Sequence, residues 1–309
     1  MVADIYTGIK ESMQLAGFKT TIVSIAHLPE ARAAITRLVI QGLVSRRLSE
    51  NWKFYLEAND GLPEAKTIII TAMPQPVVRV AFRWQGKDFP AEIAPGYFSR
   101  SDEARVEELL QKTLAADDYK MVRAHLPLKT LAVRSGLAEY GRNNIAYVSG
   151  MGSFCRLAAF YSDCPCEEDS WGDYRIMSAC TDCSICCRNC PAGSIGEERF
   201  LIHAENCLGF LCQRQPNFPY WVRLQPDWEN GLVGCMSCQL VCPVNQPYRD
   251  NAKEGPSFSE EETGQIRKAM SLDRLQPETR RKLSDISEYV YPLIASNLRE
   301  LIDRRFDFV

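Results

Sequence analysis

The chain has 309 residues, of which 46% are hydrophobic and 24% are charged, with a formal net charge of -3 and a pI of about 5.8. This composition is typical of a globular protein with room for two domains. The slight acidity argues against nucleic-acid binding driven by phosphate neutralisation, and no window holds the roughly 18 apolar residues of a membrane span. Because no export signal is visible at the N-terminus, we expect a cytoplasmic protein whose cysteines stay reduced, with no membrane partner.

The first half of the chain alternates helix-like and strand-like segments. Apolar residues at helical spacing predict helices over residues 2–16 and 31–47, and Ser101 can cap a third helix. β-Branched or alternating runs predict strands over residues 20–26, 66–73 and 77–84. The run 66–73 is apolar enough to be covered on both faces. This alternation predicts an N-terminal domain of mixed α/β (α+β) class.

The second half is organised differently. Residues 131–161 hold several glycines around two short strand-like segments. Glycines at this density serve either for turns or for the close approach of a bulky ligand, and the residues alone leave both readings open. A polar connector, 163–179, leads into a cysteine-rich segment. After it, residues 248–262 read as a polar loop, and Pro292 is well placed to open a final amphipathic helix.

Eight of the thirteen cysteines form a paired pattern. The first run is spaced C-x2-C-x2-C-x3-C, ends at a proline, and consists of Cys180, Cys183, Cys186 and Cys190. The second run repeats the end of this pattern before another proline and consists of Cys235, Cys238 and Cys242, with Cys207 between the two runs. The spacing is that of bacterial ferredoxins with two [4Fe-4S] clusters, in which the last cysteine of a run ligates the other cluster.

This crossing rule assigns the ligands of both clusters. Cluster one is expected on Cys180, Cys183, Cys186 and Cys242. Cluster two is expected on Cys190, Cys207, Cys235 and Cys238. Paired C-x2-C elements also hold zinc, but zinc accounts neither for the third cysteine of the first run nor for the two cysteine-proline endings. Cys187 and Cys212 lie close enough in sequence to compete, and Cys212 competes most directly with Cys207. The cysteines outside the pattern, expected as small buried hydrophobic residues or surface thiols, are Cys155, Cys164 and Cys166.

Two such clusters pass single electrons at low potential. A ferredoxin needs little more than the cysteine-rich segment for this task. The α/β domain that precedes this segment is therefore expected to hold the electron acceptor.

Ordered motifs over residues 65 to 245 resemble those of the epoxyqueuosine reductases and, beyond them, of the corrinoid reductive dehalogenases. Besides the cysteine runs, the motifs are AKTIIITAM at 65–73, GYFSR at 96–100, LAVRSGLAEYGRNNI at 131–145 and GSFCRLAAFYSD at 152–163. The resemblance implies a nitroreductase-like N-terminal domain with a base-off cobalamin beside the first cluster. It also implies electron flow from cluster two to cluster one to cobalt, and reductive cleavage of a carbon–heteroatom bond. The cofactor contacts carried over from the resemblance are Gly141, Arg142, Asn143, Gly152 and Ser153.

The chain departs from the reductases at the expected proton donor. Those enzymes carry an acidic residue just upstream of the motif at 131–145, but residues 120–137 of this chain read KMVRAHLPLKTLAVRSGL and contain no carboxylate. His125 is one replacement, since histidine donates a proton near neutral pH. Lys129 is another, provided that burial lowers its pKa. Tyr97 resembles the donor of the dehalogenases. Each of the three also has a purely structural explanation.

We therefore expect three segments: an α/β domain for corrinoid and substrate at 1–178, a ferredoxin-like double-[4Fe-4S] domain at 179–248, and a helical C-terminal tail at 249–309. The leading hypothesis is a cobalamin-dependent iron-sulfur reductase supplied by an external low-potential donor of ferredoxin or flavodoxin type. One alternative is an electron-transfer protein that reduces the corrinoid of a partner protein. A second is a tRNA epoxyqueuosine reductase, although the acidic balance argues against tRNA as a partner.

Overall fold

The computed structural model describes residues 2–44, 48, 61–97, 101–197, 201–213, 231–268, 271–284, 286 and 291–306. They form two compact units, each assembled from two stretches of chain. Unit 1 consists of Met1–Pro74 and Ser101–Cys183, and unit 2 of Gln75–Arg100 and Ser184–Val309. The units divide the chain differently from the three expected segments, which remain a prediction. In the described part of the chain, no helix has the length and apolar character needed to span a membrane.

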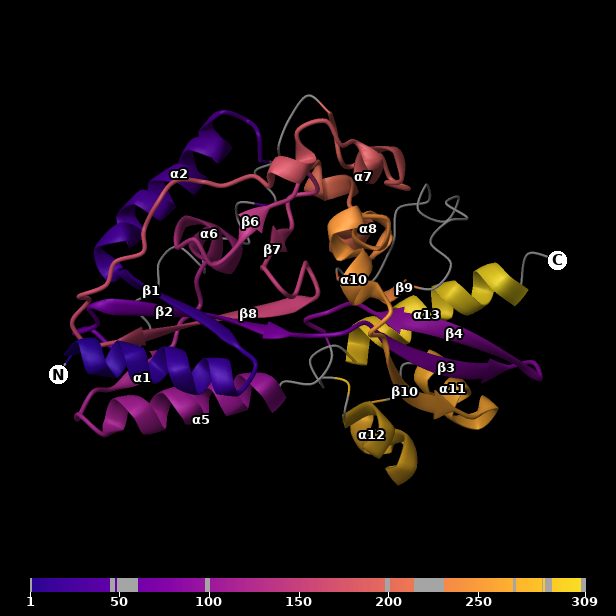
Figure 1. The fold of residues 1–309 in the computed structure, drawn as a ribbon. Helices are drawn as coiled ribbons and strands as arrows, with labels where there is room; N and C mark the ends of the chain where they lie inside the picture. Colours follow the sequence, from indigo (N-terminus) through magenta and orange to yellow (C-terminus); the bar gives the residue numbers. More distant parts are fainter. Residues whose placement is uncertain are drawn as a thin grey trace. The chain divides into compact units, whose positions relative to one another are not determined.

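Unit 1 is built on a four-stranded antiparallel sheet with helices on both faces (Figure 1). In spatial order, its strands are β1 (Lys19–Ser24), β2 (Thr67–Pro74), β8 (Cys155–Ser162) and β5 (Met121–Arg123). Its helices are α1 (Val2–Leu15), α2 (Leu28–Ile40), α5 (Ser101–Ala115) and α6 (Leu128–Arg134). A separate two-stranded ribbon is made of β6 (Glu139–Tyr140) and β7 (Ala146–Tyr147). The mixed α/β expectation is thus confirmed for this unit.

The central strands of unit 1 are covered on both sides. Below the sheet in Figure 1, α1 and α5 pack on alternate residues of the strands, among them Ile69 and Met73 of β2 and Phe160 of β8. From above, α6 lies against β2 and β8. Every residue of β2 from Thr67 to Met73 is buried in consequence, as its continuous apolar run predicts.

The predicted C-terminal end is nearly correct for helix α1 and wrong for helix α2. Helix α1 ends just before Gly17, whose φ of +78° is the left-handed conformation expected of a helix-stopping glycine. Helix α2 is shorter than the predicted 31–47: it ends at Ile40, and the chain turns through Gly42 at a φ of +68°. Residues 45–47 of that prediction lie outside the described residues.

Unit 2 holds a second four-stranded sheet, in which an antiparallel hairpin is flanked by two parallel edge strands. In spatial order, its strands are β10 (Lys253–Phe258), β3 (Val78–Trp84), β4 (Lys87–Ile93) and β9 (Gly231–Val233). Its longer helices are α11 (Glu260–Arg267), α12 (Pro277–Ser284) and α13 (Tyr291–Phe306). Its one-turn helices are α7 (Ile185–Arg188), α8 (Leu208–Leu211), α9 (Ser237–Leu240) and α10 (Gln246–Arg249).

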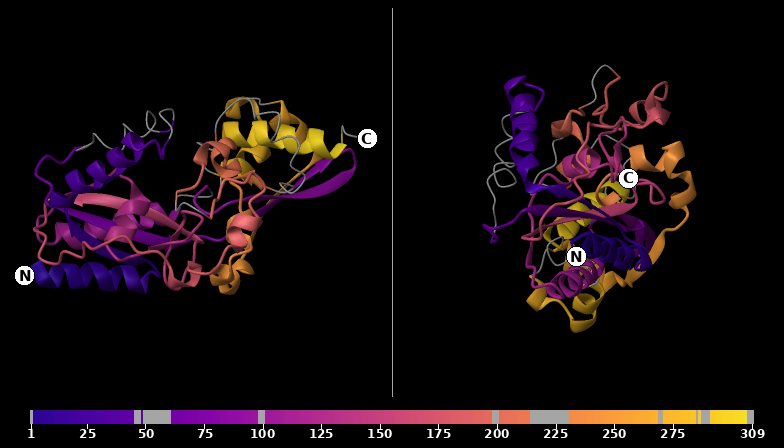
Figure 2. Two further views of the ribbon diagram at one scale, coloured as in Figure 1. Left: turned by 90° about the horizontal axis from the view of Figure 1, so that it is seen from above. Right: turned by 60° about the vertical axis from the view of Figure 1, so that its left-hand side comes forward.

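The core of unit 2 lies between this sheet and the C-terminal helices. Figure 2 (left) shows α13 running beside the β3–β4 hairpin, and Ile294 and Leu298 of α13 share one hydrophobic cluster with Val80 and Phe82 of β3. The alternation predicted for β3 is confirmed, because its buried residues alternate with exposed or half-buried ones. Pro292 is the second residue of α13, where proline is tolerated.

The expectation of a polar loop at 248–262 is wrong. This stretch contains strand β10, which pairs in parallel with β3, and the start of α11. A Cβ on Gly255 would lie 2.8 Å from Val78, so this glycine allows the two strands to approach. Ser259 caps α11 in a capping box with Glu262. Described residues between Phe258 and Ile302 therefore contribute to the core of unit 2 and are not only a helical tail.

Candidate metal centre

The cysteine-rich segment folds in unit 2 as two similar one-turn helices. Cys186 lies in α7 and Cys238 in α9, and the two helices lie against each other. Each ends one or two residues before a cysteine-proline pair, and the proline cannot continue the helix. The two runs therefore place corresponding cysteines in corresponding local positions, as their shared spacing predicts.

Three of the four cysteines expected for cluster two gather in unit 2. Burial raises the pKa values of Cys207 and Cys235, and the neighbouring thiol of Cys190 raises both further. Gly209 lies between Cys207 and Cys235, since a Cβ on it would be 3.6 Å from the Sγ of Cys207 and 3.4 Å from the backbone nitrogen of Cys235. Partly buried thiols crowded in this way keep their protons until a bound cation compensates the charge.

Cys212, the competitor of Cys207, lies near the same thiols but is more deeply buried. It is 1% exposed and packs with Leu208, and burial raises the pKa of its thiol to about 12. Its Sγ accepts a hydrogen bond of 3.1 Å from the backbone N–H of Gly234, and its carbonyl accepts one of 3.0 Å from Asn297. These contacts hold Cys212 within the fold of unit 2, and Cys207 as the fourth ligand remains a prediction.

Hydrogen-bond donors surround the predicted ligands of cluster two. The backbone N–H of Ser194 donates to the Sγ of Cys190 at 3.2 Å, and the hydroxyl of Ser237 lies 3.4 Å from the Sγ of Cys235. The hydroxyl of Ser194 is buried and has no hydrogen-bond partner among the described residues. A buried hydroxyl without a partner among the described residues, next to Cys190, fits a site that is completed by a bound group with acceptor atoms.

The chemistry of the donor set, free thiols in the spacing of a two-cluster ferredoxin, fits iron-sulfur clusters. None of the thirteen cysteines, all of which the structure describes, forms a disulfide. Over the described ranges, no three histidine, cysteine, aspartate or glutamate side chains are close enough to hold one metal ion. The preference for clusters over zinc therefore rests on the spacing of the cysteines in the chain.

Arg142 organises the start of the first cysteine run in unit 1. Its guanidinium donates to the carbonyl oxygens of Cys180 (2.8 Å), Thr181 (3.2 Å) and Cys183 (2.9 Å). Its backbone N–H donates to the Sγ of Cys180 at 3.5 Å. A planar guanidinium with several donors is suited to such a set of carbonyls. Arg142, expected as a cofactor contact, thus shapes the loop that carries two predicted ligands.

The other residues expected to contact a corrinoid have roles inside unit 1. A Cβ on Gly141 would lie 2.6 Å from both Asn143 and Tyr147, so only glycine fits there. The buried side chain of Asn143 donates to the hydroxyl of Tyr147 at 2.9 Å. Gly152, at a φ of +59°, forms a bridge with Val148, and Ser153 is buried. These contacts fit the turn-forming role of the glycines, and corrinoid contacts remain a prediction.

The three candidate proton donors lie in different settings. His125 and Lys129 belong to unit 1 and are both exposed; the ammonium of Lys129 donates to the carbonyl of Asn144 at 2.9 Å. Lys129 therefore lacks the burial on which its role as an acid depends. Tyr97 belongs to unit 2, where its ring packs on the hydrophobic core and lies 3.5 Å from where a Cβ on Gly234, the residue before Cys235, would sit. The catalytic role of each remains a prediction.

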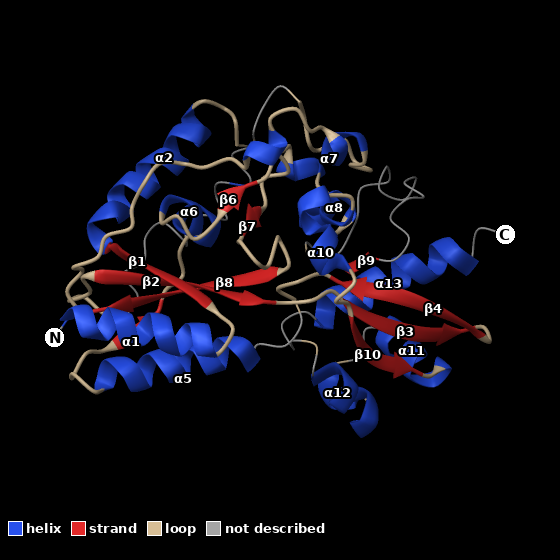
Figure 3. Ribbon diagram, viewed as in Figure 1, coloured by secondary structure: helices blue, strands red, loops and turns tan. Residues whose placement is uncertain are grey.

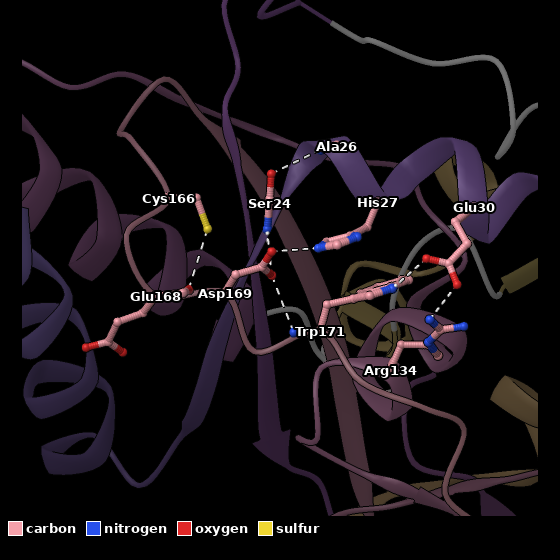
Figure 4. Close-up of polar contacts among 9 residues, drawn as sticks. All are labelled: Ser24, Ala26, His27, Glu30, Arg134, Cys166, Glu168, Asp169 and Trp171. Carbon is pink, nitrogen blue, oxygen red and sulfur yellow. Dashed lines mark hydrogen bonds and ion pairs between the residues drawn. The ribbon is translucent and has the colours of Figure 1, made fainter.

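The connector at 163–179 leads to the first cysteine, and it is held more firmly than its polar sequence suggests. Figure 3 shows its described residues largely as loop. Figure 4 shows how side chains fix this loop. Trp171 stacks on His27 at 4.7 Å between ring centroids and donates to Glu30 at 2.9 Å. Arg134 lies over the ring of Trp171 at 4.5 Å and pairs with Glu30 at 2.6 Å.

A second contact in this network involves Asp169. It accepts from the ring of His27 at 2.6 Å and from the backbone N–H of Ser24 at 3.3 Å. Burial alone would raise the pKa of Asp169, but these hydrogen bonds hold it below its usual value. Sequence reasoning missed this network, and the one available signal was a large aromatic residue, Trp171, in an otherwise polar stretch.

Comparisons with known proteins find similarity to epoxyqueuosine reductases. No family model matches the chain. Epoxyqueuosine reductase of Bacillus subtilis is 26% identical over 202 residues, which are 60% of this chain and 49% of that protein. The chain thus spans about half the length of this curated relative.

Two solved structures have a similar fold. One is the B. subtilis epoxyqueuosine reductase with its catalytic aspartate loop swung out of the active site; it matches with a TM-score of 0.68 and 20% identity over 98% of this chain and 82% of that one. The other, an epoxyqueuosine reductase with an epoxyqueuosine-modified tRNA-Tyr stem loop, matches with a TM-score of 0.67 and 20% identity over the same shares. In sequence and in fold, the chain is similar to the epoxyqueuosine reductases.

Proposed function

We propose that this chain is an iron-sulfur oxidoreductase of the epoxyqueuosine reductase type, which passes single low-potential electrons through two [4Fe-4S] clusters. The paired spacing of the eight cysteines carries this proposal, because it is the spacing of a protein with two cubane clusters. The closeness of Cys207 and Cys235 on either side of Gly209 in unit 2 supports it.

We assign the eight cysteines to the two clusters by the crossing rule. Cys190, Cys207, Cys235 and Cys238 would hold cluster two. Cys180, Cys183, Cys186 and Cys242 would hold cluster one, with Arg142 keeping the loop from Cys180 to Cys183 in place through its three carbonyl contacts. When bound, the clusters supply one-electron transfer at low potential. An external donor of ferredoxin or flavodoxin type would provide the electrons.

Cobalamin is proposed as the electron acceptor on the strength of the resemblance alone. The residues expected to contact it have contacts or burial of their own within unit 1. They do not single out a corrinoid, and no step of the proposed function is derived through it.

The substrate is the second open part of the proposal. One similar structure holds a tRNA stem loop, which weakens the expectation that tRNA is not a partner. Another has a catalytic loop with an aspartate, whereas residues 120–137 of this chain contain no carboxylate. Because that carboxylate is missing, an electron-transfer protein that reduces a partner's corrinoid is the second candidate function.

One experiment separates these candidates. Protein reconstituted anaerobically with iron and sulfide is incubated with cobalamin, passed through a gel-filtration column, and assayed for corrinoid absorbance. The reductase proposal expects corrinoid to elute with the protein. If none does, but a corrinoid protein rapidly oxidises the reduced clusters, the electron-transfer function is correct instead. Binding of an epoxyqueuosine-containing stem loop at low salt, with turnover, would identify tRNA as the substrate.

A further inference from the structure

A buried serine lies beside one of the predicted ligands of cluster two. Ser194 has no solvent exposure. Its backbone N–H donates to the Sγ of Cys190 at 3.2 Å, and its carbonyl accepts from the backbone N–H of His203 at 2.7 Å. Within the described ranges, its hydroxyl has no hydrogen-bond partner. Buried hydroxyls nearly always have one, because an unpaired polar group is costly. The hydroxyl therefore calls for an acceptor that a bound group brings to the site.

A second hydroxyl lies at another predicted ligand of the same cluster. The Oγ of Ser237 is 3.4 Å from the Sγ of Cys235. A free thiol can be either donor or acceptor in this contact, but a thiolate bound to iron has no proton to give. In the loaded site, the hydroxyl of Ser237 is therefore the donor.

Neither hydroxyl has a counterpart in the paired pattern. Ile185 precedes Cys186 in the first run, as Ser237 precedes Cys238 in the second. Gln246 follows Cys242 by four residues, as Ser194 follows Cys190, but Gln246 is exposed. The influence of Ser194 and Ser237 is thus directed at the cluster that Cys190 and Cys235 share.

We propose that Ser194 and Ser237 raise the reduction potential of cluster two by donating hydrogen bonds to its sulfur atoms. This inference rests on the proposed function, because it requires both clusters. Reduction adds one electron from the donor to the cluster and changes no covalent bond of the two serines. A hydrogen bond to sulfur stabilises the reduced cluster more than the oxidised one, because the reduced cluster carries one more negative charge.

The test is a redox titration of four proteins reconstituted with iron and sulfide: wild type, Ser194→Ala, Ser237→Ala and Ser284→Ala. The last removes an exposed hydroxyl on α12 and is the control. Dithionite delivers the electrons, and EPR spectra record the reduced clusters. In Ser194→Ala and in Ser237→Ala, we expect the ratio of reduced to oxidised cluster two to fall roughly tenfold at a given solution potential. For a one-electron couple, this fall corresponds to a reduction potential that is lower by about 59 mV. The other cluster and the control should keep the wild-type potentials.

Unchanged potentials in both alanine variants, or an equal shift of both clusters, would overturn the inference. Ser194→Thr keeps a hydroxyl and should restore the wild-type potential, which separates the hydrogen bond from a disturbed loop. If Ser194→Ala does not assemble its clusters, Ser237→Ala decides the question. Failure of the proposed function looks different: wild-type protein would then take up no iron and sulfide at all.

Discussion

Replacing Arg142 by lysine tests how unit 1 prepares the first cysteine run. The guanidinium contacts three carbonyls between Cys180 and Cys183 at 2.8 to 3.2 Å. Lysine keeps the charge, but its compact ammonium lacks the planar fork that reaches all three. A hydrogen bond in such a half-exposed place contributes about 1 kcal/mol. Loss of two of these hydrogen bonds would destabilise the closed form of the loop by about 2 kcal/mol, which lowers the ratio of closed to open forms roughly 30-fold.

The assay for this variant is the release of iron to a chelator, followed by the loss of cluster absorbance. In Arg142→Lys, we expect half of the iron to leave roughly 30-fold faster than in wild type, because only cluster one depends on this loop. The other half should leave at the wild-type rate. Arg188→Lys is the matched control, since its guanidinium is exposed and contacts Ser184 on the same segment. Wild-type rates for all the iron, together with lost cobalamin binding, would refute the reasoning and make Arg142 a cofactor contact.

Two further predictions concern unit 2. Cys207→Ser should halve the iron content per chain, whereas Cys212→Ser should retain both clusters. Iron analysis of the reconstituted variants checks this prediction. The reverse result would make Cys212 the ligand. Glu262→Gln removes the partner of the largely buried Lys282, at 2.8 Å, and should destabilise unit 2 by about 3 kcal/mol. In anaerobic urea unfolding, the exposed control Glu278→Gln should cost less than about 1 kcal/mol; equal effects would contradict a special role for Glu262.

The features that the sequence predicts well are those set by spacing within one segment. The stop of α1 at Gly17, the buried run of β2 and the alternation of β3 each depend on neighbours a few residues away. The two cysteine runs belong to the same class, because a one-turn helix and a proline fix where each thiol lies. Local rules of this kind need no knowledge of the rest of the fold.

The features that it misses depend on partners far along the chain. Strand β10 looks like a polar loop because its pairing with β3, and the close approach at Gly255, come from another part of the sequence. The contacts of Trp171 with His27 and Glu30 are equally distant. At Gly141, sequence reasoning indicated a close approach, but the contacts with Asn143 and Tyr147 are visible only in the fold.

The central claim is that the eight paired cysteines hold two [4Fe-4S] clusters. The most direct measurement is the iron, zinc and acid-labile sulfide content of protein purified and reconstituted without oxygen, with Mössbauer spectra of the bound iron. We expect about eight iron atoms and about eight sulfides per chain, with the spectrum of cubane clusters. One or two zinc ions per chain without labile sulfide, persisting after reconstitution, would contradict the account and make the paired cysteines a structural zinc site.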